Sequence, residues 1–329
     1  MEYFKLIQVI VFPGLAYLVA LAIFFEWYKR KLVARMQSRL GPTYTGFRGI
    51  LQPLADFLKL LFKEDIEVTT GDQRLLTAVL LVAPTLFIFS LFFVPVMGTP
   101  IFSFEGDLLL VLFLSSMASL LLYLVGWTFR SSFTKAGAVR LLLQIVGFDI
   151  AAITLALVPA FEAESLCIAT IAQKLPSTIL KNPLLLAPHI LAFILFLLSQ
   201  QADLEEDPFD IPHAETELVA GYITEISGRK LAFLDLFRDI QMVYVSFFTA
   251  SLFFGVLIPP ISAIFVPLST IEMLIKAMLV LFILFAIEAA STRIRIYNLL
   301  DIFWKYIIPL SFLSLSILFI IKALPGVIL

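Results

Sequence analysis

The sequence contains very few of the residues that hold metals. Among its 329 residues there is one cysteine, Cys167, and there are two histidines, His189 and His213. Zinc sites and Fe–S clusters need several thiolate or imidazole ligands close together. A metal ion or Fe–S cluster bound within this chain is therefore not expected, and Cys167 is expected to serve as a small apolar residue.

Charged residues are also scarce, whereas apolar residues are abundant. Charged side chains make up 15% of the chain and hydrophobic ones 61%, including 33 phenylalanines, and the mean hydropathy is +1.02. A soluble domain has too little polar surface to cover so many apolar side chains. The composition therefore predicts an integral membrane protein.

Eight apolar windows are long enough to cross a bilayer, which takes about 20 mostly apolar residues in a helix. We expect one all-α membrane domain over residues 1–329, and we expect the first window to remain as a span and not to be a cleaved signal peptide. The windows are 6–28, 75–97, 108–129, 139–160, 184–202, 240–260, 271–290 and 303–323.

Lysine and arginine are concentrated in alternate loops of this arrangement. The first loop, 29–74, carries nine, the third, fourth, fifth and seventh carry two or three each, and the second and sixth carry none. Because basic residues accumulate in cytoplasmic loops, the odd-numbered loops are predicted to be cytoplasmic. Both termini then lie on the outside.

The first loop contains a stretch with helical periodicity. In residues 49–64 the apolar side chains recur every three or four positions, against a polar face that includes Gln52, Asp56 and Lys59. This pattern predicts an amphipathic helix that lies at the membrane interface.

Asp149 is the deepest ionisable residue in the apolar windows. It lies ten residues past the start of the fourth window, which is about 15 Å along a helix. A buried acid costs about 2.5–3.5 kcal/mol on insertion scales, so such residues are usually functional. We favour a proton relay for Asp149 over a structural hydrogen bond between helices.

Other ionisable residues in the windows have simpler interpretations. Glu272 and Lys276 are four residues apart and are expected to form a structural pair. Glu288 is expected to pair with Arg293 or Arg295 beyond the end of its helix. Glu26 is expected to reach the membrane interface. His189 is expected to form structural hydrogen bonds.

The fifth loop is unusually acidic. Eight carboxylates and no lysine or arginine occur from Asp203 to Glu225. The apolar residues in 215–228 recur at helical spacing, so this half is expected to be a helix packed against protein. Because carboxylates clustered in a partly dry site share protons, the loop is predicted to buffer or admit protons.

Several motifs in this chain resemble the eight-helix membrane subunit of respiratory complex I, the subunit 1/H family. The first loop contains RMQSRLGP (35–42) and the 49–64 stretch GILQPLADFLKLLFKE. The fourth window begins with GAVRLLLQ (137–144), followed by Asp149. The acidic loop contains PFD (208–210), ETELVAGY (215–222) and EISG (225–228). The resemblance covers nearly the whole chain.

The resemblance implies a coupling subunit that has no active site and binds no cofactor itself. It would dock a peripheral Fe–S subunit and link it to antiporter-like subunits in the cell membrane of a prokaryote, with no nucleic-acid partner. The proton-path residues that this implies are Glu215, Glu217, Glu225 and Asp149, to which we add His213 and Glu288. The docking residues that it implies are Arg35, Arg39, Gln52, Asp56 and Lys59.

Departures from the complex I pattern indicate a branch within this family. The acidic run 205–207 replaces a segment that carries arginine, and His213 replaces a glutamate. Glu288 is followed by Arg293 and Arg295. These features are similar to membrane-bound hydrogenase-type, ferredoxin-linked complexes, in which a NiFe-hydrogenase-like large subunit is a partner and no quinone is required.

Two alternatives remain open. A quinone chamber of an NADH- or ferredoxin-quinone oxidoreductase would keep the same architecture. A stand-alone ion transporter is disfavoured because the chain has no paired halves with matched broken helices. The terminal electron acceptor and the coupling ion, H⁺ or Na⁺, stay open.

Overall fold

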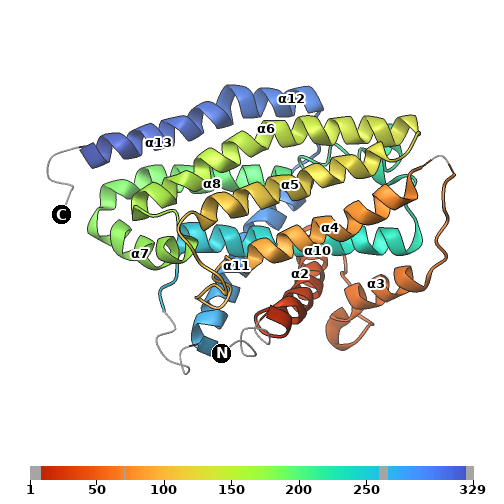
Figure 1. The fold of residues 1–329 in the computed structure, drawn as a ribbon, viewed down its shortest axis with the longest axis horizontal. Helices are drawn as coiled ribbons and strands as arrows, with labels where there is room; N and C mark the ends of the chain where they lie inside the picture. The colour runs from red at the N-terminus through yellow and green to blue at the C-terminus, as the bar shows by residue number, and fades with distance from the viewer. Residues whose placement is uncertain (1–8, 70, 259–265, 324–329) are drawn as a thin grey trace.

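The computed structural model describes residues 9–69, 71–258 and 266–323. Every regular element in these ranges is a helix (Figure 1), which confirms the all-α prediction. The α-helices are α2 (Leu15–Met36), α3 (Gln52–Phe62), α4 (Gln73–Leu91), α5 (Asp107–Trp127), α6 (Ser132–Ala163), α7 (Ile168–Lys181), α8 (Leu186–Asp203), α9 (Glu215–Leu218), α10 (Gly228–Thr249), α11 (Val266–Ala290), α12 (Ile296–Ile302) and α13 (Ile308–Ala323).

Six helices within the described ranges are long and apolar enough to cross a membrane. They correspond to six of the eight predicted windows and are Gln73–Leu91, Asp107–Trp127, Ser132–Ala163, Pro183–Asp203, Val266–Ala290 and Ile296–Ala323. The predicted windows 6–28 and 240–260 overlap α2 and α10, although residues 6–8 and 259–260 lie outside the described part. Charged residues are more frequent in α2 and α10 than in the other six helices, so these two are less apolar.

Helix α6 is the long central element of the bundle. It packs against α5, α7, α8 and α13, whereas α10 packs against α2, α4 and α11. Figure 1 shows α4, α5, α6, α8 and α13 running roughly alongside one another, with α2 and α11 inclined to them and α3 at one edge. The core between the helices is apolar, with fully buried Phe25, Phe87 and Phe248.

A helix, α3, lies within the predicted stretch 49–64, and Pro53 near its start suits the first turn, where its missing N–H would have no partner. A second amphipathic helix, α7, follows α6 and was not predicted. Its buried residues Ile168, Ile171, Ala172 and Leu175 recur at helical spacing. At 14 residues it is too short to span a bilayer, so its sequence contains no apolar window of spanning length.

The continuous helix expected in residues 215–228 is wrong. The structure has one helical turn, α9, and a 3₁₀ turn at Gly221–Ile223. Val219, between the two turns, has φ +64°, and Gly221, at the start of the 3₁₀ turn, has φ +57°. These left-handed backbone conformations end the helix. A Cβ on Gly221 would lie 1.8 Å from the Pro212 oxygen, so only glycine fits this close approach.

The acidic loop packs directly on α6 through a glycine. A Cβ on Gly137 would lie 2.6 Å from the Tyr222 nitrogen, whereas a Cβ on Gly147 of the same helix would meet Leu299 at an ordinary 3.5 Å. Gly137 therefore lets the loop backbone contact the helix, whereas Gly147 makes no such close contact.

Gly137→Ala should lower the unfolding free energy by about 1–3 kcal/mol, because the added methyl overlaps backbone that cannot move alone. The matched Gly147→Ala should raise it by about 0.5–1 kcal/mol, the ordinary gain from alanine in a helix. Thermal unfolding of the purified protein in detergent measures both. Equal shifts for the two variants would show that the loop does not depend on this contact.

The predicted partners of the buried charges are partly confirmed. Glu272 and Lys276 form the expected ion pair. His189 is hydrogen-bonded at both ring nitrogens, to Glu162 Oε2 at 2.7 Å and to the Phe253 oxygen at 3.0 Å. The pairing of Glu288 with Arg293 or Arg295 is wrong, because neither arginine forms an ion pair with it in the described residues. Glu288 instead interacts with the charge of Lys29, and Arg293 donates to Thr216 Oγ1 at 2.9 Å.

Candidate functional site

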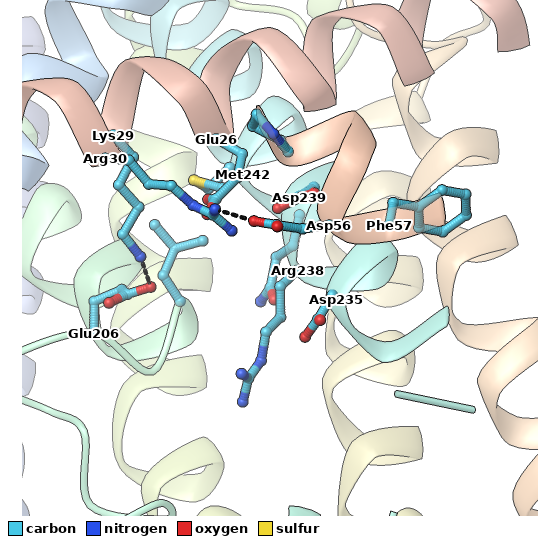
Figure 2. Close-up of a pocket in the computed structure, with 13 residues that line it drawn as sticks. Glu26, Lys29, Arg30, Asp56, Phe57, Glu206, Asp235, Arg238, Asp239 and Met242 are labelled. Carbon is cyan, nitrogen blue, oxygen red and sulfur yellow. Dashed lines mark hydrogen bonds and ion pairs between the residues drawn. The ribbon is translucent and has the colours of Figure 1, made fainter. Parts of the chain in front are cut away.

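A cavity of about 200 Å³ lies where α2, α3, α10 and the start of the acidic loop meet (Figure 2). Its lining contains five carboxylates and three cations. The carboxylates are Glu26, Asp56, Glu206, Asp235 and Asp239, and the cations are Lys29, Arg30 and Arg238. We call this space the acid-lined cavity.

Three elements place these charges together for simple reasons. On α10, residues 235, 238 and 239 lie on one face because residues three and four apart in a helix are neighbours. On α2, Arg30 bonds Glu26 Oε1 at 2.6 Å and also pairs with Asp56 of α3. Lys29 pairs with Glu206 of the acidic loop, as Figure 2 shows. The cavity is thus closed by ion pairs between segments distant in sequence.

Two carboxylates of the cavity have no cation at ion-pair distance within the described residues. These are Asp235 and Asp239 on α10, and Figure 2 shows Asp239 near Glu26. Acids that gather in a partly buried space share protons, because neighbouring like charges disfavour full ionisation. The cavity can therefore hold exchangeable protons.

Behind the cavity lies a buried cluster centred on Glu205. Its Oε2 atom accepts hydrogen bonds from His213 Nε2 at 2.5 Å and from the Tyr222 hydroxyl at 2.9 Å. Arg238 Nη2 lies 3.7 Å away. Burial alone would raise the pKa of Glu205, but the His213 hydrogen bond, together with the charges of His213 and Arg238 and the Tyr222 hydroxyl, holds that pKa below its ordinary value.

The His213 ring has two competing partners on one nitrogen. Nε2 contacts both Glu205 Oε2 and Arg238 Nη2. A guanidinium only donates and an ionised carboxylate only accepts. The Arg238 contact therefore needs a lone pair on Nε2, whereas the Glu205 contact needs a proton there. Whether Nε2 carries a proton therefore decides which of the two neighbours His213 holds.

Asp210, in the same loop, is a partly buried acid with a raised pKa. Burial raises the pKa of its carboxyl from 3.8 to about 6, with smaller effects from the charge of His213, which lowers it, and from the neighbouring acids, which raise it. As pH rises from about 4 to about 6, the unfolded chain loses this proton while the folded chain keeps it, so folding stability falls.

Asp210→Asn should remove this pH dependence. The variant should match the parent near pH 4 and become increasingly more stable than the parent as pH approaches 7, because the ordinary carboxyl must ionise in a buried place. Thermal midpoints measured through this pH range test the difference. An offset that is the same at every pH would contradict the assignment.

A second, smaller cavity lies deeper in the bundle and contains Asp149 and Asp203. Ser116 donates to Asp149 Oδ1 at 2.6 Å, and Ser119 donates to Asp203 Oδ1 at 2.8 Å. Its volume of about 10 Å³ is close to what one water occupies, about 10–15 Å³. Gln200 also lines it and has a buried oxygen without a protein partner. The space is therefore polar enough for a water between the two acids.

A hydrogen bond from α10 links residues that line the two cavities. Gln241 lines the acid-lined cavity and donates from Nε2 to the backbone oxygen of Asp203, which lines the smaller cavity, at 2.9 Å. Asp203 and Glu205 are two residues apart at the end of α8. The resulting series runs from the acid-lined cavity through Glu205 and Asp203 to Asp149. We call it the carboxylate series.

Other predicted proton-path residues lie apart from this series. Glu217 bonds Arg140 at 2.6 Å and is half-exposed, and that hydrogen bond and charge hold the pKa of Glu217 below its ordinary value. Glu225 is half-buried. The side chain of Glu215 lies outside the described part. Glu288 interacts electrostatically with Lys29 at the edge of the acid-lined cavity.

The predicted docking residues occupy different surroundings. Asp56 lines the acid-lined cavity, and Gln52 donates to its Oδ1 at 2.9 Å. Arg39 and Lys59 are exposed. Arg35 lines a separate groove on the other side of α2.

Sequence reasoning missed much of this site. It did not single out Asp203, Glu205, Arg238 or Asp239. One signal was available, because residues 235, 238 and 239 have helical spacing just before an apolar window. Within the described residues, no three His, Cys, Asp or Glu side chains are grouped to hold a metal ion.

Comparison with known proteins gives one consistent result. A family described as NADH dehydrogenase matches residues 7–319. The H subunit of NADH-quinone oxidoreductase from Thermomicrobium roseum is 33% identical over 324 residues, covering 91% of each chain. The H subunit numbered 2 from Syntrophobacter fumaroxidans is 31% identical with 92% of each chain covered, and the H subunit from Syntrophotalea carbinolica is 32% identical with 95% covered. The chain therefore belongs to the complex I subunit 1/H family, and it is a membrane subunit of this kind.

Proposed function

We propose that this chain is the coupling subunit of an ion-translocating oxidoreductase. It would dock a peripheral Fe–S module at the acidic opening and link it to antiporter-like subunits. The observation that carries the proposal is the carboxylate series, which joins a charged cavity to an acid deep in the bundle. A passive anchor would have no use for Asp149 and Asp203 around a polar space, since such acids are costly in a membrane.

His213 supplies a means of coupling in this proposal. A change of charge in the docked neighbour would favour the ring tautomer whose Nε2 carries no proton, and so exchange the contact with Glu205 for one with Arg238. Freed from its strongest hydrogen bond, Glu205 would take up a proton more readily. Protons would then pass by Asp203 to Asp149.

The ferredoxin-linked, hydrogenase-like branch is the version that we favour. Eight charged groups line the acid-lined cavity, whereas its apolar lining is limited to Pro53, Phe57, Leu204 and Met242. A quinone has a neutral headgroup and an apolar tail, and binding pockets for such ligands are mostly apolar. The names of the relatives, which are NADH-quinone oxidoreductase subunits, support the quinone alternative instead.

We further propose eight spans, with α2 and α10 completing the six, in a prokaryotic cell membrane. Six charges in these two helices would be tolerated because they face the acid-lined cavity and not lipid; they are Glu26, Lys29, Arg30, Asp235, Arg238 and Asp239. Both termini would lie outside and the acidic loop in the cytoplasm, following the distribution of lysine and arginine.

Two measurements on the assembled complex test this function. Purification in mild detergent should bring down Fe–S subunits, and in the favoured branch a NiFe-hydrogenase-like large subunit. A chain that purifies alone and moves ions in vesicles would contradict the proposal. Quinone analogues should leave the redox reaction unchanged in that branch. Inhibition by such analogues would move the assignment to the quinone alternative.

A further inference from the structure

A basic groove lies on the other side of α2 from the acid-lined cavity. It has a volume of about 430 Å³ and is lined by Trp27, Lys31, Arg35 and Met36 of α2, by Arg48 of the first loop and by Phe282 of α11. The loop is held over α2 by hydrogen bonds from Trp27 Nε1 to the Arg48 oxygen at 3.2 Å and from Lys31 Nζ to the Pro42 oxygen at 2.8 Å. The groove is therefore a built feature, formed by segments of distant sequence.

Its charge is of one sign. Lys31, Arg35 and Arg48 line the groove, and no carboxylate does. Within the described residues none of these three cations forms an ion pair, whereas Lys29 and Arg30, on the opposite side of α2, are both paired with acids. Three cations around one space, with no compensating acid, favour an anionic ligand.

Its apolar wall continues along α11 as a stripe of exposed side chains. Phe282 is 47% exposed, and Leu279, Ile275 and Ile271 continue the stripe with exposures of 46%, 59% and 53%. These residues recur every three or four positions, so they lie on one face of the helix. Such a face in a membrane span contacts hydrocarbon.

From these observations we propose that the groove binds the headgroup of an anionic phospholipid. The phosphate would lie among Lys31, Arg35 and Arg48, and an acyl chain would follow the exposed stripe of α11. Trp27 suits this depth, because tryptophan is enriched where a span meets the headgroups. An acidic protein segment would not use the stripe, and a neutral quinone headgroup would not use three cations.

Tryptophan quenching tests this assignment directly. The chain has three tryptophans, so Trp127→Phe with Trp304→Phe leaves Trp27 as the only reporter in this chain. The assembled complex carrying these changes is placed in phosphatidylcholine vesicles that contain either brominated phosphatidylglycerol or brominated phosphatidylcholine. Trp27 should be quenched at an at least about fivefold lower content of the anionic lipid, the ratio that one basic residue near a membrane surface produces.

Two further variants locate the effect. Arg35→Gln with Arg48→Gln should abolish the preference, and Arg48→Gln alone should reduce it. Arg74→Gln removes an exposed cation at the start of α4, which does not line the groove, and should leave the preference unchanged. Inorganic phosphate should not compete. Three outcomes would overturn the proposal. Both lipids could quench Trp27 equally, or a quinone could remove the quenching. Neither lipid could quench Trp27 in the complex, which would show that another subunit covers the groove.

Discussion

Asp149→Asn in the assembled complex is expected to reduce ion translocation more than about tenfold, which corresponds to a barrier raised by about 1.4 kcal/mol. The redox reaction of the peripheral module should continue. Asparagine keeps the size of the side chain and can still bond Ser116, but it cannot carry a proton. Redox turnover and ion uptake, measured in the same vesicles, separate the two effects.

Two controls make the Asp149 result specific. Asp149→Glu keeps the carboxyl group beside the small cavity and should retain much of the translocation. Asp301→Asn removes an exposed carboxylate of α12 that pairs with Lys305 at 2.8 Å and should leave translocation unchanged. Normal translocation by Asp149→Asn would show that the series is structural, and the chain would then be an anchor for its neighbours.

Glu162→Ala is expected to lower the unfolding free energy by about 3–5 kcal/mol, the usual cost of removing one partner from a buried polar pair. Glu162 and His189 are 2% and 5% exposed, so water cannot replace the lost contact. Phe253 lies in the last turn of its helix, where carbonyls lack partners inside the helix. His189 bonds this carbonyl and ties three segments together.

A nearby glutamate provides the matched control for this pair. Glu164 is two residues away, is largely exposed and bonds Lys322 at 2.7 Å, so Glu164→Ala should change stability by no more than about 1 kcal/mol. Glu162→Gln should recover most of the loss, because its amide can donate to Nδ1 while Nε2–H still donates to Phe253. Unfolding in detergent measures all three. Equal losses for Glu162→Ala and Glu164→Ala would contradict this account.

The carboxylate series could not be predicted in detail from local patterns. Ser116 and Asp149 are 33 residues apart, and Ser119 and Asp203 are 84 apart. Helical periodicity says which residues share one helix face, but it does not say which faces of different helices meet. The depth of Asp149 in its apolar window therefore identified it from the sequence, whereas the residues that contact it in the fold could not be predicted.

The prediction of a helix in the acidic loop was wrong for a different reason. Its apolar spacing is helical, yet Val219 and Gly221 adopt positive φ and the segment folds back on Pro212. Close packing against Gly137 fixes this path. Tertiary contacts overrode the local pattern, as they commonly do in short segments.

The amino-acid sequence by itself determined the all-α membrane class, six of the helices that are long and apolar enough to cross a membrane, the helical character of α3 and the Glu272–Lys276 pair. All of these depend on composition or on the helix repeat, which act over a few turns. Only the tertiary structure decided that Asp56 meets Arg30, that Glu206 meets Lys29 and that Asp203 and Asp149 share one small cavity. Those contacts join distant segments, and their geometry follows from how whole helices pack.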